Sequence, residues 1–109
     1  MFKIILIFFF CFSFVCPWFA EDQKVYQIII KDHKFEPAQL NIPAGQKIKL
    51  TIENKDSTPE EFESYSLNRE KLVAGNKQII IYIGPVKAGT YSYFGDFHPQ
   101  TAKGELVAQ

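Results

Sequence analysis

Residues 47–53 alternate polar and apolar side chains without interruption, and this pattern constrains the fold more than any other feature. Alternation with a period of two is typical of a β-strand that buries one face. Residues 25–30 and 78–83 are more evenly apolar, which predicts strands that are buried on both faces. Residues 91–94 and 105–108 are shorter strand candidates.

Groups of Gly, Pro, Asn and Asp separate these segments, at residues 43–45, 54–56, 74–76, 84–85 and 88–89. Turn signals at spacings of about 8–12 residues indicate an all-β sandwich. No segment repeats apolar residues at helical spacing over three turns, and residues 67–72 are expected to form at most one short helical turn. The sequence therefore predicts one all-β domain of about seven to eight short strands.

The first twenty residues have the features of a signal for export. A basic residue precedes an apolar run at residues 4–16, and Ala20 is a small residue before an acidic pair. A run of this length is typical of a signal peptide and short for a membrane span. We therefore expect a signal peptide at residues 1–20 and a periplasmic or otherwise exported domain at residues 21–109. The alternative is an uncleaved anchor over residues 4–20, which would be the only contact with a membrane.

Cleavage would remove all sulfur, because the single methionine and both cysteines are Met1, Cys11 and Cys16. The remaining domain would form no disulfide and offer no thiolate or thioether ligand. The formal net charge of zero provides no basic field for nucleic acid. Two imidazoles, His33 and His98, are too few for a three-His zinc centre. Because no phosphate-binding glycine motif and no nucleophilic triad occur, we expect a protein that is not an enzyme.

Several short motifs follow one another in an order that resembles the cupredoxin-like domain. Residues 35–37 read Phe-Glu-Pro, and residues 40–45 read as a short strand that ends in a Pro-Ala-Gly turn. Residues 49–56 resemble the strand that ends in Asn-x-Asp, and residues 89–94 resemble the strand that leads into the metal loop. The resemblance implies a cupredoxin-like Greek-key β-sandwich.

The chain is also similar to the cupredoxin-like domains of periplasmic iron-uptake proteins of the EfeO type. Those domains carry an acidic stretch like residues 59–64 and a loop like residues 95–99. The resemblance implies a bound metal ion, iron or copper, and a role in its uptake or handling. It also implies a membrane iron permease, or another uptake component, as the partner.

Most of the copper ligands of the family are absent from this chain. The resemblance aligns Glu60 with the first His, Gly95 with the Cys and Lys103 with the Met, and only His98 matches its ligand. Without a thiolate, a blue-copper centre is not expected. Lys103 introduces an alternative, because it could pair with Glu60 or Asp96 and leave a neutralised, metal-free site.

Carboxylates and one imidazole are therefore the expected metal ligands, namely Glu60, Glu61, Glu63, Asp96 and His98. If the loops superpose on the family's fold, Glu60, Asp96 and His98 converge at one end of the sandwich. Strand parity places Glu60 on one face and Glu61 with Glu63 on the other. Oxygen donors with one imidazole suit iron, manganese, zinc or Cu(II).

A second function from another class stays open at this point. The domain could be a metal-free sandwich that binds a protein partner through an exposed Tyr65, Tyr82 or Tyr93, its copper site having decayed. Clustered, unpaired ligands would favour the metal, whereas carboxylates paired with Lys103 would favour the interaction module. His33 lies in a short charged turn and is expected to be solvated rather than a ligand.

Overall fold

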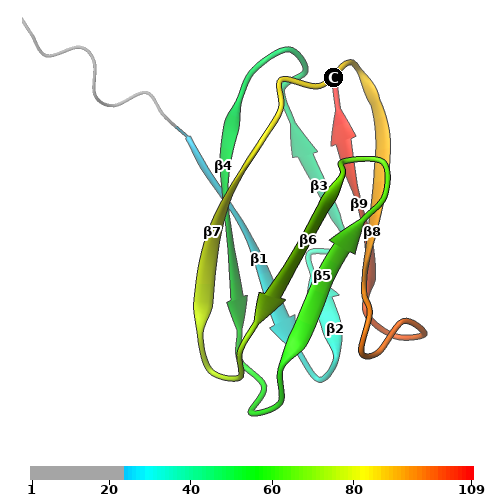
Figure 1. Cartoon of the computed structure of the whole chain (residues 1–109). Helices are drawn as coiled ribbons and strands as arrows, with labels where there is room; N and C mark the ends of the chain where they lie inside the picture. The colour runs from blue at the N-terminus through cyan, green and yellow to red at the C-terminus, as the bar shows by residue number, and fades with distance from the viewer. Residues whose placement is uncertain (1–23) are drawn as a thin grey trace, which may run out of the picture.

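The protein is an all-β sandwich, described for residues 24–109 by a computed structural model that contains nine strands in two sheets (Figure 1). The strands are β1 (Val25–Lys31), β2 (Lys34–Glu36), β3 (Gln39–Ile42), β4 (Ile48–Asn54), β5 (Glu60–Ser64), β6 (Arg69–Val73), β7 (Gln78–Ile83), β8 (Gly89–Gly95) and β9 (Lys103–Ala108). The predicted fold class is confirmed, with nine strands in place of the seven to eight expected. The predicted signal peptide, residues 1–20, lies outside the described residues and stays a prediction.

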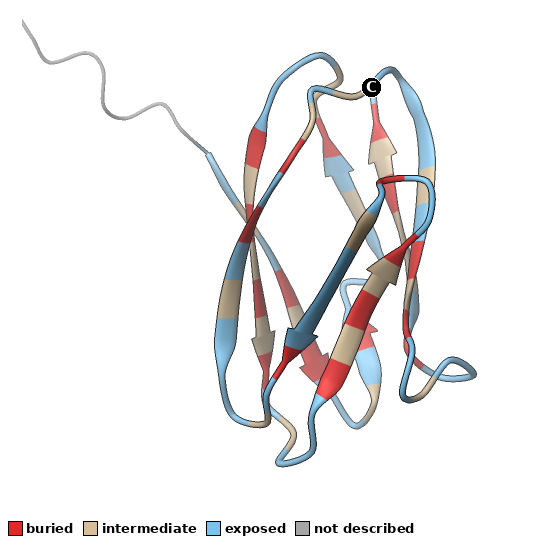
Figure 2. Cartoon of the chain, in the orientation of Figure 1, coloured by how far each residue is buried: buried red, intermediate tan, exposed pale blue. Residues whose placement is uncertain are grey.

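The two sheets pack face to face, so that each buries one side and turns the other to solvent (Figure 2). One sheet has the order β2-β1-β4-β7, and the other has the order β3-β9-β8-β5-β6. The pairs β1–β4 and β3–β9 are parallel, and the remaining neighbours are antiparallel. Among residues 24–109, no helix is long and apolar enough to cross a membrane.

The alternation predicted for residues 47–53 is present in β4, where every second residue is buried. The prediction that residues 25–30 and 78–83 are buried on both faces is wrong. β1 fully buries only Ile28 and Ile30, and Ile80 in β7 is 48% exposed. β-Branched side chains favour strands on either face, so an apolar run does not by itself indicate that both faces are covered.

The helical turn expected at residues 67–72 does not form. Leu67 lies buried in a turn, and residues 69–73 form β6, the edge strand that pairs antiparallel with β5. An edge strand has few buried side chains and therefore little apolar alternation. The strand is specified by its pairing with β5, which local sequence does not reveal.

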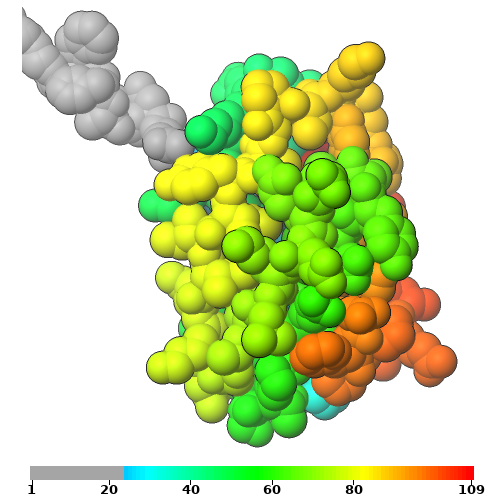
Figure 3. Space-filling view, viewed as in Figure 1, coloured from blue at the N-terminus to red at the C-terminus, as the bar shows by residue number. Residues whose placement is uncertain are grey.

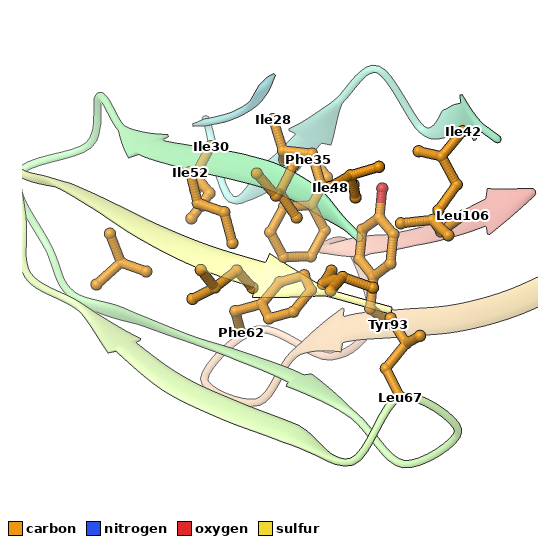
Figure 4. Close-up of a cluster of buried hydrophobic side chains, with 14 of the residues drawn as sticks. Ile28, Ile30, Phe35, Ile42, Ile48, Ile52, Phe62, Leu67, Tyr93 and Leu106 are labelled. Carbon is orange, nitrogen blue, oxygen red and sulfur yellow. The ribbon is translucent and has the colours of Figure 1, made fainter. Parts of the chain in front are cut away.

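Three aromatic rings form the part of the core that supports one end of the sandwich (Figure 4). The rings of Phe35, Phe62 and Tyr93 lie with centroids 5.1–6.0 Å apart. Tyr93 is 1% exposed, so the sequence-based suggestion of Tyr93 in a surface patch is wrong. Its ring covers Gly104 so closely that a Cβ there would lie 2.5 Å from a ring carbon, which explains the glycine.

Each of these aromatic residues lies two positions along the chain from a residue near one end of the sandwich. Within a regular strand, residues two positions apart point to the same face. Phe35 follows His33, Phe62 follows Glu60, and Tyr93 precedes Gly95. At this end the β1–β2 turn, the β4–β5 loop and the β8–β9 loop lie close together (Figure 1). Figure 3 shows the orange β8–β9 loop packed against green atoms, with cyan atoms at the same lower edge.

Candidate metal site

Side chains from three segments meet at this end of the sandwich. His33 comes from the β1–β2 turn, Glu60 is the first residue of β5, and His98 lies in the loop between β8 and β9. One ligand atom from each residue lies within 4.8 Å of the others. We call these three residues the inner group.

Glu60 is the buried centre of the inner group, with 1% of the residue exposed. Its Oε1 lies 2.6 Å from Nδ1 of His98, so the imidazole donates this hydrogen bond from Nδ1. Its Oε2 accepts the backbone N–H groups of Phe97 at 2.9 Å and Glu61 at 3.1 Å. A buried carboxylate needs such donors, because an unpaired charge away from water is costly.

Gly95 provides the space that the Glu60 carboxylate fills. A Cβ at position 95 would lie 2.5 Å from the carboxylate carbon and 2.8 Å from Cβ of Ala102. Since real atoms do not approach so closely, a side chain at position 95 and the Glu60 carboxylate exclude each other in this arrangement. A thiolate-bound copper centre does not fit these residues, because residues 24–109 contain no cysteine and the carboxylate occupies the space beside Gly95.

His33 is the inner-group residue that sequence reasoning left out. Its ring stacks on that of His98, with centroids 3.6 Å apart and an angle of 17° between the planes. His33 has a positive φ of 58°, and the preceding Asp32 has one of 53°, as in a tight hairpin turn. The sequence signal was a two-residue turn between two strands. That this turn lies against the β8–β9 loop follows only from the tertiary structure.

Asp56 in the β4–β5 loop holds this turn. Its Oδ1 accepts the N–H of Asp32 at 2.8 Å, and its Oδ2 accepts the N–H of His33 at 3.0 Å. Partial burial alone would raise the pKa of Asp56, but these N–H groups and the nearby imidazoles outweigh it and lower the pKa. The carboxylate therefore stays charged beside the inner group.

The five predicted ligands do not form one cluster. Glu60 and His98 are together in the inner group, whereas Glu61 and Glu63 project from the other face of β5, as strand parity predicts. There Glu61 and Glu63 lie with Glu70 of β6, and we call these three residues the outer group. The backbone N–H of Asp96 donates to the carbonyl of Glu61 at 2.8 Å, so Asp96 is fixed beside the outer group.

Hydrogen bonding, desolvation and mutual repulsion all raise carboxyl pKa values in the outer group. A hydrogen bond with Glu70, partial desolvation and the charges of Glu70, Asp96 and Glu63 raise the pKa of Glu61 to about 7. Desolvation and the charges of Glu70 and Asp96 also raise the pKa of Glu63. A raised carboxyl pKa means that this group relieves its repulsion by taking up protons.

The alternative in which Lys103 neutralises the site is not what the structure has. Within residues 24–109, the ion pairs join imidazoles to carboxylates, His98 to Glu60 and His33 to Asp56, and none involves Lys103. The His33 and His98 side chains are 41% and 31% exposed. The inner group is thus a buried carboxylate with two partly exposed imidazoles, a donor set that suits Fe, Zn or Cu(II).

Comparison with known proteins supports the fold and the family. A family model described as a cupredoxin-like domain matches residues 3–108. An uncharacterized protein of Rickettsia prowazekii (strain Madrid E) is 49% identical over 81 residues, or 74% of this chain. The matched part spans 65% of the length of that relative.

Three solved structures illustrate the likeness in fold. Auracyanin A, a blue copper protein from Chloroflexus aurantiacus, has a TM-score of 0.68 at 17% identity and covers 79% of this chain and 98% of its own. A purple cupredoxin from Nitrosopumilus maritimus has a TM-score of 0.60 at 23% identity, covering 77% and 99%. Amicyanin from Paracoccus versutus has a TM-score of 0.63 at 18% identity, covering 83% and 86%. At these identities the likeness establishes the sandwich fold alone.

Proposed function

The chain belongs to the cupredoxin-like domain family, and from this premise we propose that it is an exported protein that binds a metal ion without a thiolate. The ligands are His33, Glu60 and His98. The observation that carries the proposal is the buried Glu60 carboxylate. Among residues 24–109 its charge partner is the imidazole of His98, and no Lys or Arg side chain forms an ion pair with it. Its bound cation would be iron or Cu(II), with Cu(II) the tightest of the divalent ions.

The inner group supplies the charge and the access that such a site needs. Glu60 contributes a fixed negative charge at the base of the site, and the half-exposed imidazoles connect it to solvent. Because imidazole must be deprotonated at the ligating nitrogen, metal affinity is expected to fall as the pH falls. The absence of a thiolate from residues 24–109 favours capture and delivery of an ion over the chemistry of a blue-copper centre.

The role in metal uptake extends the resemblance to iron-uptake proteins. In this role the protein captures iron or copper outside the cytoplasm and passes it to a membrane iron permease. Deleting the protein would then lower iron or copper accumulation when that metal is scarce, and the Glu60→Gln variant would not restore it. Normal accumulation in the deletion strain under metal limitation would contradict this role.

A metal titration of the protein purified from the export compartment tests the site itself. We expect Cu(II) and Fe(III) to bind with 1:1 stoichiometry, and Glu60→Gln and His98→Ala to weaken binding at least about tenfold, as loss of a ligand or of its partner does. Glu53→Gln is the matched control, because it removes one carboxylate from the outer face of β4. Equal weak binding by all four proteins would refute the metal site.

One observation favours a second function, a metal-free module that binds a protein. Both oxygens of Glu60 already accept hydrogen bonds within the protein. The inner group can therefore serve only to hold the β8–β9 loop in place. Tyr65, in the turn after β5, is 79% exposed, and Leu72 in β6 of the same sheet is 57% exposed. In that case no metal binds, and Tyr65→Ser lowers partner binding whereas Glu60→Gln lowers only stability.

A further inference from the structure

We propose that Asp56 is a positioning residue of the metal site, which sets the place and orientation of His33 so that two imidazoles, rather than one, serve the same ion. This inference rests on the proposed function of the inner group. Asp56 is not a member of the inner group, and its two carboxylate oxygens accept hydrogen bonds from the β1–β2 turn.

The turn that carries His33 needs outside support. Both of its central residues, Asp32 and His33, have a positive φ, and neither is a glycine. Side chains in this region of backbone space are strained unless the surroundings compensate. The Asp56 carboxylate provides that compensation, since it accepts the N–H groups of both residues at 2.8 and 3.0 Å.

Asp56 is itself firmly anchored. Its N–H donates to Oδ1 of Asn54 at 2.9 Å, and its carbonyl accepts the N–H of Asn76 at 2.8 Å. Asn54 is buried, and its amide donates to the carbonyl of Thr58 at 2.9 Å. Gly75 packs so tightly on this loop that a Cβ there would meet the carbonyl of Ser57 at 2.1 Å. Asp56 therefore holds the turn in a fixed position relative to the sandwich.

The same carboxylate also orients the imidazole. Nδ1 of His33 lies 3.5 Å from Oδ2 of Asp56, so this nitrogen faces a negative charge and Nε2 is the nitrogen that remains for a metal. Carboxylates beside the second nitrogen commonly fix the orientation of a ligating histidine. The stacked rings are nearly parallel, and in-plane lone pairs on parallel rings do not meet at one point. One of the two rings must therefore tilt when an ion binds, while the hydrogen bonds from the backbone of the turn to Asp56 keep His33 beside the site.

Cu(II) is the probe for this proposal, since its electron paramagnetic resonance spectrum counts the coordinating nitrogens. We expect two imidazole nitrogens in the unaltered protein and one in both Asp56→Ala and His33→Ala. Asp56→Ala should lower the Cu(II) affinity by about 10-fold to 100-fold, the effect typical of an outer partner of a ligand. In the double variant the loss should be no larger than in His33→Ala alone, because both changes remove the same ligand.

A measurement without metal separates positioning from general destabilisation. The stacked rings shift the imidazole C–H proton resonances of His98, and we expect Asp56→Ala to abolish this shift while the strands stay folded. Asp32→Asn is the matched control, because it removes a carboxylate from the same turn but keeps both N–H donors to Asp56. It should leave the nitrogen count and the resonances unchanged.

The outcomes distinguish this inference from the proposed function. If the unaltered protein binds no Cu(II), the metal site itself is refuted. If it binds Cu(II) with dependence on Glu60 and His98, but Asp56→Ala keeps two nitrogens and full affinity, only the role of Asp56 is overturned. Additive losses in Asp56→Ala and His33→Ala would also overturn it.

Discussion

The inner and outer groups each contain a glutamate of β5, and the two glutamates lie in opposite environments. Glu60 points into the sandwich, where two backbone N–H groups and the imidazole of His98 receive its charge. Glu61, the next residue, points outward and faces Glu70 and Glu63, with no cation paired to it among residues 24–109. The Glu60 carboxylate has directed hydrogen-bond donors, whereas the surroundings of Glu61 raise its pKa and favour its protonated form.

An acidic stretch therefore does not act as a unit when it lies on a strand. Alternation sends successive side chains to opposite faces, so a run of glutamates divides into two environments. The outer group gathers three carboxylates, and among residues 24–109 none of them forms an ion pair with a cation. The inner group has a single carboxylate with directed donors and two imidazoles, and for this reason it carries the metal proposal.

The largest expected effect comes from removing the inner carboxylate. Glu60→Ala should lower the free energy of unfolding by about 3 kcal/mol, because it leaves a cavity and deprives two partly buried N–H groups and His98 of their acceptor. Urea denaturation monitored by circular dichroism measures this. Glu63→Ala on the same strand is the control and should leave stability unchanged or slightly raised. Equal losses for both variants would erase the distinction between the groups.

A change at Gly95 tests whether the inner carboxylate depends on the space beside it. Gly95→Ala should destabilise the fold by about 1–3 kcal/mol, because the added methyl group collides with Glu60 and Ala102. In the Glu60→Ala background the same change should be less harmful, since one of the two collisions is gone. Strictly additive effects in denaturant titrations would show that the two positions do not share this space.

The smallest expected effect concerns pH and the outer group. Because the pKa of Glu61 rises from 4.5 to about 7 on folding, the folded protein holds a proton that the unfolded chain releases. Stability should therefore decrease as the pH rises from about 4.5 through about 7.

Glu61→Gln removes this contribution, and thermal unfolding across that pH range should show a flatter profile than the unaltered protein. The histidine pairs of the inner group remain in both proteins, so the difference between the two profiles isolates Glu61. Identical pH profiles would mean that the charges of the outer group are screened by solvent.

Much of the fold follows from local patterns in the sequence. The alternation in residues 47–53 predicts β4 and its buried face. The turn signals at residues 43–45, 74–76 and 84–85 also fall between observed strands. Strand parity also predicts that Glu60 and Glu61 lie on opposite faces of β5. These predictions succeed because the period of two is a property of the extended backbone itself.

The parts that could not be predicted depend on contacts between distant segments. Residues 67–72 were expected to form at most one short helical turn, and the strand β6 that forms there comes from pairing with β5 at the sheet edge. His33 was expected to be solvated. Its ring lies against His98 because the β1–β2 turn and the β8–β9 loop, which are far apart in sequence, meet in the fold. Local periodicity contains no information about either approach.

From the sequence alone follow the β-sandwich, the low sulfur content and the acidic residues near His98, the one ligand that matches the family resemblance. These features are accessible because strand periodicity and composition are local properties. Only the tertiary structure decided which carboxylate is buried, that Gly95 leaves room for it, and that His33 and Asp56 join the site. These features require the β1–β2 turn, the β4–β5 loop and the β8–β9 loop to meet, and that meeting is fixed by the packing of two sheets.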